Sequence, residues 1–267
     1  MSLSPAAPAR RSISAFRSVL VTFLAAGTGV ACRPPEDGVR TGAGGKGKIS
    51  PARSVIGNSV EGRPIECLSF GDGADSILVI ATIHGNESAG TPLLERLVEH
   101  ISYRPELMAG RRIMLVPVTN PDGYAHRTRH NVRGVDLNRN FPASNWQNSS
   151  QHGDSALSEP ESVALHGLLQ SARPSRIVSL HEPYGCIDYD GPGEGLARAM
   201  AAACDLPVKK LGGRPGSLGS YAGESLGIPI ITVEFPEYVA RWDGAAMWDR
   251  YGKMLLAAIE YAQPSAQ

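Results

Sequence analysis

The chain has 267 residues, of which 42% are hydrophobic and 19% are charged, and it carries 26 basic and 26 acidic residues. A chain of this length and composition can bury the core of one globular domain. Its formal net charge is zero and it has no basic stripe with interleaved aromatic residues, which argues against a nucleic-acid-binding protein.

Residues 1–32 have the pattern of an export signal. A segment with three arginines precedes the apolar run 19–30, which ends just before Cys32. This run is shorter than the about 20 residues that cross a bilayer. A cysteine after a small residue at this place resembles a bacterial lipoprotein cleavage site, although Gly29 stands where leucine is usual, so a plain signal peptide is the alternative. We expect an exported protein, periplasmic or membrane-anchored through a lipid on Cys32.

Two further segments follow the export signal. Residues 33–48 are rich in proline and glycine without an apolar period, which predicts a flexible linker. Residues 49–267 form the expected catalytic domain. Removal of 1–32, which holds three arginines and no acidic residue, leaves 23 basic residues (26 minus 3) against 26 acidic ones.

The first chemically informative element is a buried strand expected at 77–82, followed by His84 and Glu87 and then by a helix at 89–101. A strand that ends in His-x-x-Glu can direct both side chains to one point beyond the sheet edge. An imidazole and a carboxylate are two of the three ligands of a His/His/Glu zinc site, which keeps a fourth position open.

A second strand is expected at 112–118, and the loop after it carries several polar motifs. It contains NPDGY at 120–124 and GVDLNRNFP at 134–142, with Arg129 between them. Ser158 and Glu161 then predict a capping box at the start of a helix at 159–171.

The third metal ligand is expected at His181, directly after a buried strand at 176–180. In open α/β sheets, ligands bind beyond the carboxyl ends of the strands, so histidines at two such ends are well placed to meet. The other five histidines lie in expected helices or loops and are interpreted as solvated or core residues: His100, His126, His130, His152 and His166.

The last strand is expected at 230–234 and ends in Glu234, between helices expected at 194–204 and 243–261. A carboxylate after such an apolar run is partly desolvated, which raises its pKa toward the range of a general base. Glu237 is the rival, but Pro236 makes it a loop residue.

The alternation of strands and helices predicts a single α/β domain with a mixed, centrally parallel, twisted sheet covered by helices on both faces. The cysteines do not predict a disulfide framework, because an odd number remains once Cys32 is set aside: Cys67, Cys186 and Cys204. Cys186 and Cys204 could form a disulfide, or each could be a small buried hydrophobic residue.

Several motifs occur in the order in which the M14 zinc carboxypeptidase family carries them, and the chain resembles that family from about residue 50 to about residue 240. The matching segments are IGNSVEGRP at 56–64, His84 to Glu87, NPDGY and GVDLNRNFP in the loop, SEPE at 158–161, His181 and Glu234. The resemblance implies the fold of a zinc carboxypeptidase and one zinc ion per chain.

The resemblance also assigns roles to single residues. It implies that His84, Glu87 and His181 bind zinc and that Glu234 is the catalytic carboxylate. It implies further that Arg129 polarises the scissile carbonyl group. Asn138 and Arg139 would hold the free carboxylate of the substrate, a task for which the planar guanidinium is well suited.

Some features differ from the digestive carboxypeptidases. Gly216-Ser217 resembles the pair that follows a mobile-loop tyrosine in those enzymes, but no tyrosine precedes it here, and Tyr221 comes after it. Ser217 and Leu218 are the expected substrate-binding residues of this loop. In the family, the position of Leu218 helps to set the preference for the side chain of the substrate. Leu218 is apolar and gives no counter-charge for a basic side chain of the substrate.

The short chain and the motif GVDLNRNFP look most like the bacterial murein peptide amidases within this family. This implies a small peptide substrate cut between γ-D-glutamate and meso-diaminopimelate. The alternatives are a carboxypeptidase acting on ordinary peptides, an N-acyl amino acid deacylase, and a catalytically dead peptide-binding lipoprotein. The last is disfavoured because His84, Glu87, His181 and Glu234 are all present.

Overall fold

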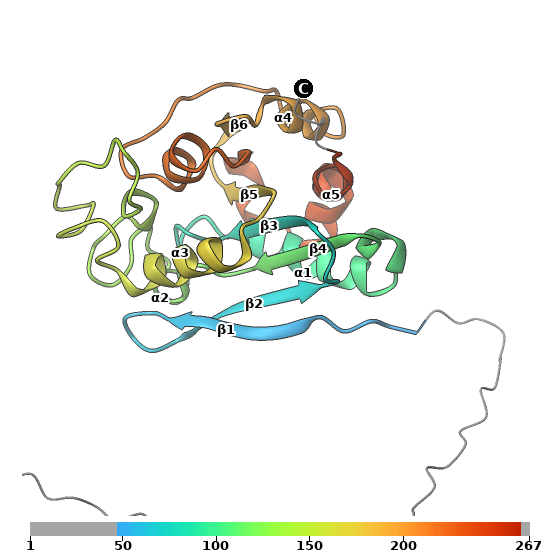
Figure 1. Ribbon diagram of the computed structural model, residues 1–267, viewed down its shortest axis with the longest axis horizontal. Helices are drawn as coiled ribbons and strands as arrows, with labels where there is room; N and C mark the ends of the chain where they lie inside the picture. The colour runs from blue at the N-terminus through green and yellow to red at the C-terminus, as the bar shows by residue number, and fades with distance from the viewer. Residues whose placement is uncertain (1–46, 263–267) are drawn as a thin grey trace, which may run out of the picture. The chain divides into compact units, whose positions relative to one another are not determined.

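A seven-stranded mixed sheet is the centre of the fold, and a computed structural model describes it over residues 47–262. Its strand order is β1-β2-β4-β3-β5-β7-β6, running from β1 at the bottom of Figure 1 to β6 near the top. In chain order the strands are β1 (Ala52–Asn58), β2 (Pro64–Phe70), β3 (Asp75–Ala81), β4 (Arg111–Val116), β5 (Arg176–His181), β6 (Tyr184–Asp190) and β7 (Ile230–Pro236).

The four central strands β4, β3, β5 and β7 are parallel, whereas β1, β2 and β6 join antiparallel. This confirms the expected centrally parallel sheet. The register pairs Ala81 of β3 with Leu180 of β5, and His181 with Glu234 of β7. The carboxyl ends of these three strands therefore reach the same sheet edge.

Helices cover both faces of the sheet, as expected. The α-helices are α1 (Gly90–Ser102), α2 (Pro121–His126), α3 (Pro160–Ala172), α4 (Glu194–Ala201) and α5 (Gly244–Glu260). Shorter 3-10 segments are η1 (Pro105–Met108), η2 (Leu137–Arg139) and η4 (Glu237–Arg241), and a π-helical segment is η3 (Ser220–Ser225). Among the residues that the structure describes, no helix is long and apolar enough to span a membrane.

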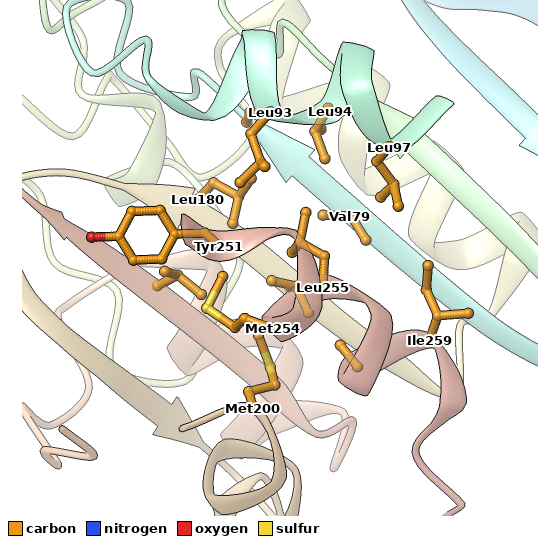
Figure 2. Close-up of a cluster of buried hydrophobic side chains, with 14 of the residues drawn as sticks. Val79, Leu93, Leu94, Leu97, Leu180, Met200, Tyr251, Met254, Leu255 and Ile259 are labelled. Atoms are coloured by element: carbon orange, nitrogen blue, oxygen red, sulfur yellow. The ribbon is translucent and has the colours of Figure 1, made fainter. Parts of the chain in front are cut away.

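Two hydrophobic cores lie on opposite faces of the sheet, because successive side chains of a strand point to opposite sides. Val79 and Leu180 pack against α1, α4 and α5 in one core, where Figure 2 shows Leu93, Met254 and their neighbours. Leu78 packs with residues of α3 in the other core. Both faces of the central strands are thus buried.

The capping box expected at 158–161 is not present. The helix begins after Glu159, and no side chain caps it. Ser158 Oγ donates to Glu159 Oε1 at 2.9 Å, and Glu161 Oε1 accepts from the Val60 amide at 3.1 Å. The reciprocal pair does not form because the N-cap position is occupied by Glu159 rather than Ser158, and because Glu161 accepts from Val60 and Asn131 instead.

The sequence also left open whether Cys186 and Cys204 pair. In the structure both are free thiols, as is Cys67. Cys186 is fully buried, which fits a small core residue. The expected export signal, Cys32 and most of the expected linker lie outside the described residues.

Candidate metal centre and active site

His84 is presented by a tight turn at the carboxyl end of β3. Thr82 has a φ of 53°, an uncommon left-handed conformation for a β-branched residue, and this redirects the chain as it leaves the strand. At Gly85 a side chain is excluded, because a Cβ atom there would lie 1.9 Å from the carbonyl carbon of Gly123. The turn that carries His84 is therefore fixed by its contact with α2.

His84, Glu87 and His181 meet beyond the sheet edge. Each offers a ligand atom, these atoms lie within 4.8 Å of one another, and all three residues are buried. His181 Nδ1 lies 2.9 Å from Glu87 Oε2, and the two imidazole rings are 4.9 Å apart between centroids. Two imidazoles and one carboxylate are the donor set of open zinc sites.

The two ring nitrogens of His84 have different surroundings. Nε2 lies 3.0 Å from Asp136 Oδ1, and since a carboxylate only accepts, Nε2 carries the proton. Nδ1 then has a free lone pair, is buried without a hydrogen bond, and lies 2.9 Å from Glu87 Oε1. Two acceptors that face each other at this distance leave a place for a cation, so the residues fit a zinc ion.

Glu87 and Asp136 are both held ionised. Burial opposes ionisation of Glu87, but the hydrogen bond from His181 and the neighbouring His84 ring outweigh it and keep the Glu87 pKa well below its usual range. For Asp136, burial is likewise outweighed by His84 and by the charge of Arg129, so its pKa is also low. Arg129 donates to both carboxylates, at 2.7 Å to Glu87 and 3.1 Å to Asp136.

Glu234 faces the same space from β7. It pairs with His181 in the sheet register, and its side chain is 8% exposed. Burial raises the pKa of its carboxyl group, His181 opposes this, and the charge of Glu87 adds to it. One oxygen, Oε2, is buried without a hydrogen bond. The rival Glu237 is exposed and does not line the cavity.

A single cavity of about 200 Å³ joins the three clustered residues to Glu234, Arg129, Asn138 and Arg139. Asn138 Oδ1 accepts from the Leu218 amide at 2.9 Å, which leaves its amide group as a donor. Arg139 donates to the Asn138 carbonyl at 2.6 Å. Burial lowers the Arg139 pKa, yet a guanidinium stays charged in proteins. The cavity thus holds cationic and neutral donors for a carboxylate.

The expected loop residues 217 and 218 have different positions. Ser217 lines the cavity and accepts from the Ser220 amide at 3.0 Å. Leu218 is 2% exposed and its side chain packs in the core on the α3 face, away from the residues that line the cavity. Tyr221 is also buried, and its hydroxyl accepts from Gln170, so it does not replace a mobile-loop tyrosine.

Sequence reasoning gave no role to several residues of this cavity. Asp136 lies behind the cavity and positions His84, from which it is 52 residues away in the chain. Asp188 and Asp190 also line the cavity. They are two residues apart, a spacing typical of one strand face, and this spacing could have indicated that both side chains lie on the same side of a strand. The cavity is further lined by Tyr184 and Arg214.

Comparison with known proteins agrees with this geometry. The model of the zinc carboxypeptidase family matches residues 51–189. The chain belongs to the zinc carboxypeptidase family. Membership makes it a zinc-dependent peptidase, an enzyme rather than a binding protein.

Within the zinc carboxypeptidases, the chain is similar to murein peptide amidase A of Escherichia coli strain K12, with 34% identity over 210 residues that cover 72% of this chain and 84% of the relative. A crystal structure of murein-tripeptide amidase from Escherichia coli O157 superimposes with a TM-score of 0.65 and 30% identity, covering 83% of this chain and 96% of that one. Carboxypeptidase A of Helicoverpa armigera, with 21% identity and a TM-score of 0.66 over 80% of this chain and 69% of its own, shares the fold.

Proposed function

We propose that this zinc carboxypeptidase hydrolyses the amide bond between γ-D-glutamate and meso-diaminopimelate in cell-wall peptides. The observation that carries the proposal is the single cavity that joins His84, Glu87 and His181 to Glu234 and to Arg139. The similarity to two proteins described as murein peptide or murein-tripeptide amidases supports this choice of substrate.

In this proposal His84, Glu87 and His181 hold the zinc ion, and Asp136 keeps the His84 ring in the orientation that the metal requires. When bound, zinc supplies Lewis-acid chemistry, polarising a carbonyl group and acidifying water to a pKa of roughly 7. Glu234 accepts a proton from the attacking water at its carboxylate and passes it to the leaving amine.

Arg129 and the pair Asn138 and Arg139 bind the substrate. Arg129 stabilises negative charge on the carbonyl oxygen as it develops. Arg139 and the Asn138 amide group bind the free carboxylate of the residue beyond the cut bond. Ser217 lies in the same cavity and contributes to this end of the site.

Because the carboxylate-binding pair suits any acid with a free carboxylate next to the amide, ordinary peptides and N-acyl amino acids are the alternative substrates. A digest of purified muropeptides, read by mass spectrometry, separates these functions. We expect release of diaminopimelate from a tripeptide and no cleavage of N-acyl amino acids at matched concentrations. Cleavage of the N-acyl amino acids alone would show that the chain is a deacylase.

We also propose that the protein is exported and lipid-anchored at Cys32, on the sequence pattern of its first 32 residues. The mass of the mature N-terminus tests this, with cleavage before Cys32 and an added diacylglyceryl group as the expected result. A mature chain that begins elsewhere, or a Cys32→Ser protein that still fractionates with membranes, would contradict the anchor.

A further inference from the structure

Glu182 lines the active-site cavity next to His181, but the proposed reaction gives it no task. It lies directly after β5 and is 7% exposed. A buried carboxylate is costly unless hydrogen bonds compensate it, so its hydrogen-bond partners indicate what it does. These partners lie on the segment between β3 and α1, which carries Glu87.

The side chain of Glu182 binds the start of α1. Its Oε1 atom accepts a hydrogen bond from the amide of Ala89, the N-cap residue of α1, at 2.9 Å. In a capping box, the side chain of the third helical residue accepts this hydrogen bond from the N-cap amide. In α1 that third residue is Pro92, which has no side-chain acceptor. Glu182 therefore supplies from the end of β5 an acceptor that the helix lacks.

The backbone of Glu182 makes a second link to the same segment. Its amide donates to Glu87 Oε2 at 3.3 Å, and the same oxygen lies 2.9 Å from His181 Nδ1. Residue 182 thus contacts position 87 through its amide and position 89 through its carboxylate. The end of β5 and the turn that leads into α1 are joined at two neighbouring points.

The start of α1 is also packed closely against the sheet. A Cβ atom at Gly90 would lie 2.8 Å from Leu180 Cβ and 2.9 Å from Ala81 Cβ, so the helix begins in direct contact with the ends of β5 and β3. Thr91 Oγ1 lies 2.7 Å from the hydroxyl of Thr82, the residue after β3. These contacts hold α1 to β3, and the Glu182 carboxylate holds it to β5.

We propose that Glu182 is a positioning residue for the zinc site, which holds the turn bearing His84 and Glu87 at a fixed distance from His181. This inference rests on the zinc ligands named in the proposed function, and it does not depend on which amide is hydrolysed. Loss of a group that orients metal ligands typically weakens metal binding about 10- to 100-fold. The link needs an acceptor with the reach of a glutamate side chain rather than a negative charge.

Three substitutions separate the reach of the side chain from its charge. Glu182→Gln keeps an oxygen at the same reach, Glu182→Asp keeps the charge but is shorter by a methylene group, and Glu182→Ala removes both. Zinc is withdrawn from the loaded enzyme by competition with a chromophoric chelator, which gives the zinc affinity. We expect about 10- to 100-fold weaker binding in the alanine and aspartate variants, and binding close to wild type in Glu182→Gln.

The visible spectrum of the cobalt(II)-substituted enzyme reports the arrangement of the ligands. It should change in Glu182→Ala and Glu182→Asp but not in Glu182→Gln. Asp243→Ala is the matched control, because Asp243 caps α5 outside the cavity and accepts from the Ala246 amide at 2.9 Å. This control should lower the midpoint of thermal unfolding and leave the zinc affinity and the cobalt spectrum unchanged.

A folded Glu182→Ala protein that is less stable but binds zinc as tightly as the wild type would make Glu182 a structural cap and overturn the proposal. Weak binding in Glu182→Gln with normal binding in Glu182→Asp would show that charge matters instead of reach, and would overturn it too. If Glu182→Ala does not fold, the glutamine and aspartate variants still decide. A zinc-loaded wild type that cuts no muropeptide would contradict the proposed function alone, because the affinities do not depend on the substrate.

Discussion

At the scale of single residues, the candidate site holds one carboxylate among the proposed metal ligands and a second carboxylate that we propose as the base. Glu87 and Glu234 are both buried carboxylates at one sheet edge, but their pKa values shift in opposite directions. Glu87 receives hydrogen bonds from charged or polar donors, whereas Glu234 is desolvated and has an oxygen without a hydrogen bond. Environment, not residue type, assigns the two tasks.

Replacement of Glu234 by glutamine should remove the base without removing the metal. We expect Glu234→Gln to keep stoichiometric zinc and to lose kcat by at least ~10²-fold, the contribution of a positioned general base. Glu237→Gln is the matched control, since Glu237 is exposed outside the cavity, and it should retain wild-type activity. Near wild-type kcat for Glu234→Gln, measured with metal content, would remove Glu234 from the mechanism.

Arg139 should bind the free carboxylate of the substrate, a charge-assisted pair worth roughly 1.5–3 kcal/mol per hydrogen bond. Either Arg139→Ala or amidation of that carboxylate should therefore cost about 10²-fold in kcat/KM. Their combination should cost little more, because both remove one interaction. If the amidated peptide is cut as well as the free acid, the enzyme is an endopeptidase and this role of Arg139 is wrong.

At the scale of elements, the sequence predicted those strands that a local pattern of consecutive apolar residues marks. The buried strands β3, β5 and β7 were recognisable from apolar runs, and the polar residues at their ends marked the site. The edge strand β1 and its neighbour β2 were missed because the residues of β1 are largely exposed and those of β2 are only partly buried. Strand β6 was missed because aspartate is disfavoured in strands, and the register with β7 overrides that preference.

The contrast between local patterns and long-range contacts also explains which site residues could be predicted from the sequence. His84 and His181 were identified because strand ends converge in this fold class, and Glu234 by the same rule. Asp136 was not identified, because its contact is with His84, which is distant from it in the chain. No local pattern carries that information.

The turn after β3 should depend on a glycine. In Gly85→Ala the new Cβ would collide with the backbone of Gly123, so we expect destabilisation of several kcal/mol, as for other strained or overpacked sites, together with weaker zinc binding. Gly167→Ala in α3 is the control, because a Cβ there meets no atom within 4 Å, and it should stabilise by about 0.5–1 kcal/mol. Chemical denaturation measures both, and equal stability of the two variants would contradict this account of the turn.

At the scale of the whole molecule, the buried carboxyl group of Asp190 should reduce the stability of the folded protein at neutral pH. The Asp190 pKa is about 6 in the folded state against 3.8 for the ordinary group, so the folded protein holds the extra proton between these values. Stability should therefore fall as pH rises from about 4 to about 6 and stay reduced above that range. Asp188, Lys210 and Glu224 are the charged groups that act on it.

Asp190→Asn should accordingly be more stable than the wild type at pH 8, by roughly 1–3 kcal/mol, and should lose most of that gain near pH 4. Urea unfolding at the two pH values measures the difference. Asp72→Asn, on the surface, should show no such pH-dependent gain. An Asp190→Asn protein that is less stable at pH 8 would show that the carboxylate is compensated inside the fold.

The central claim is that one zinc ion, held by His84, Glu87 and His181, makes this chain a peptidase. The most direct measurement is zinc content, determined together with muropeptide hydrolysis, in wild type and in His84→Ala, with His130→Ala as a histidine control outside the cavity. We predict one zinc per chain and activity in wild type and His130→Ala, and loss of both in His84→Ala. Stoichiometric zinc in a folded His84→Ala protein would contradict the metal site.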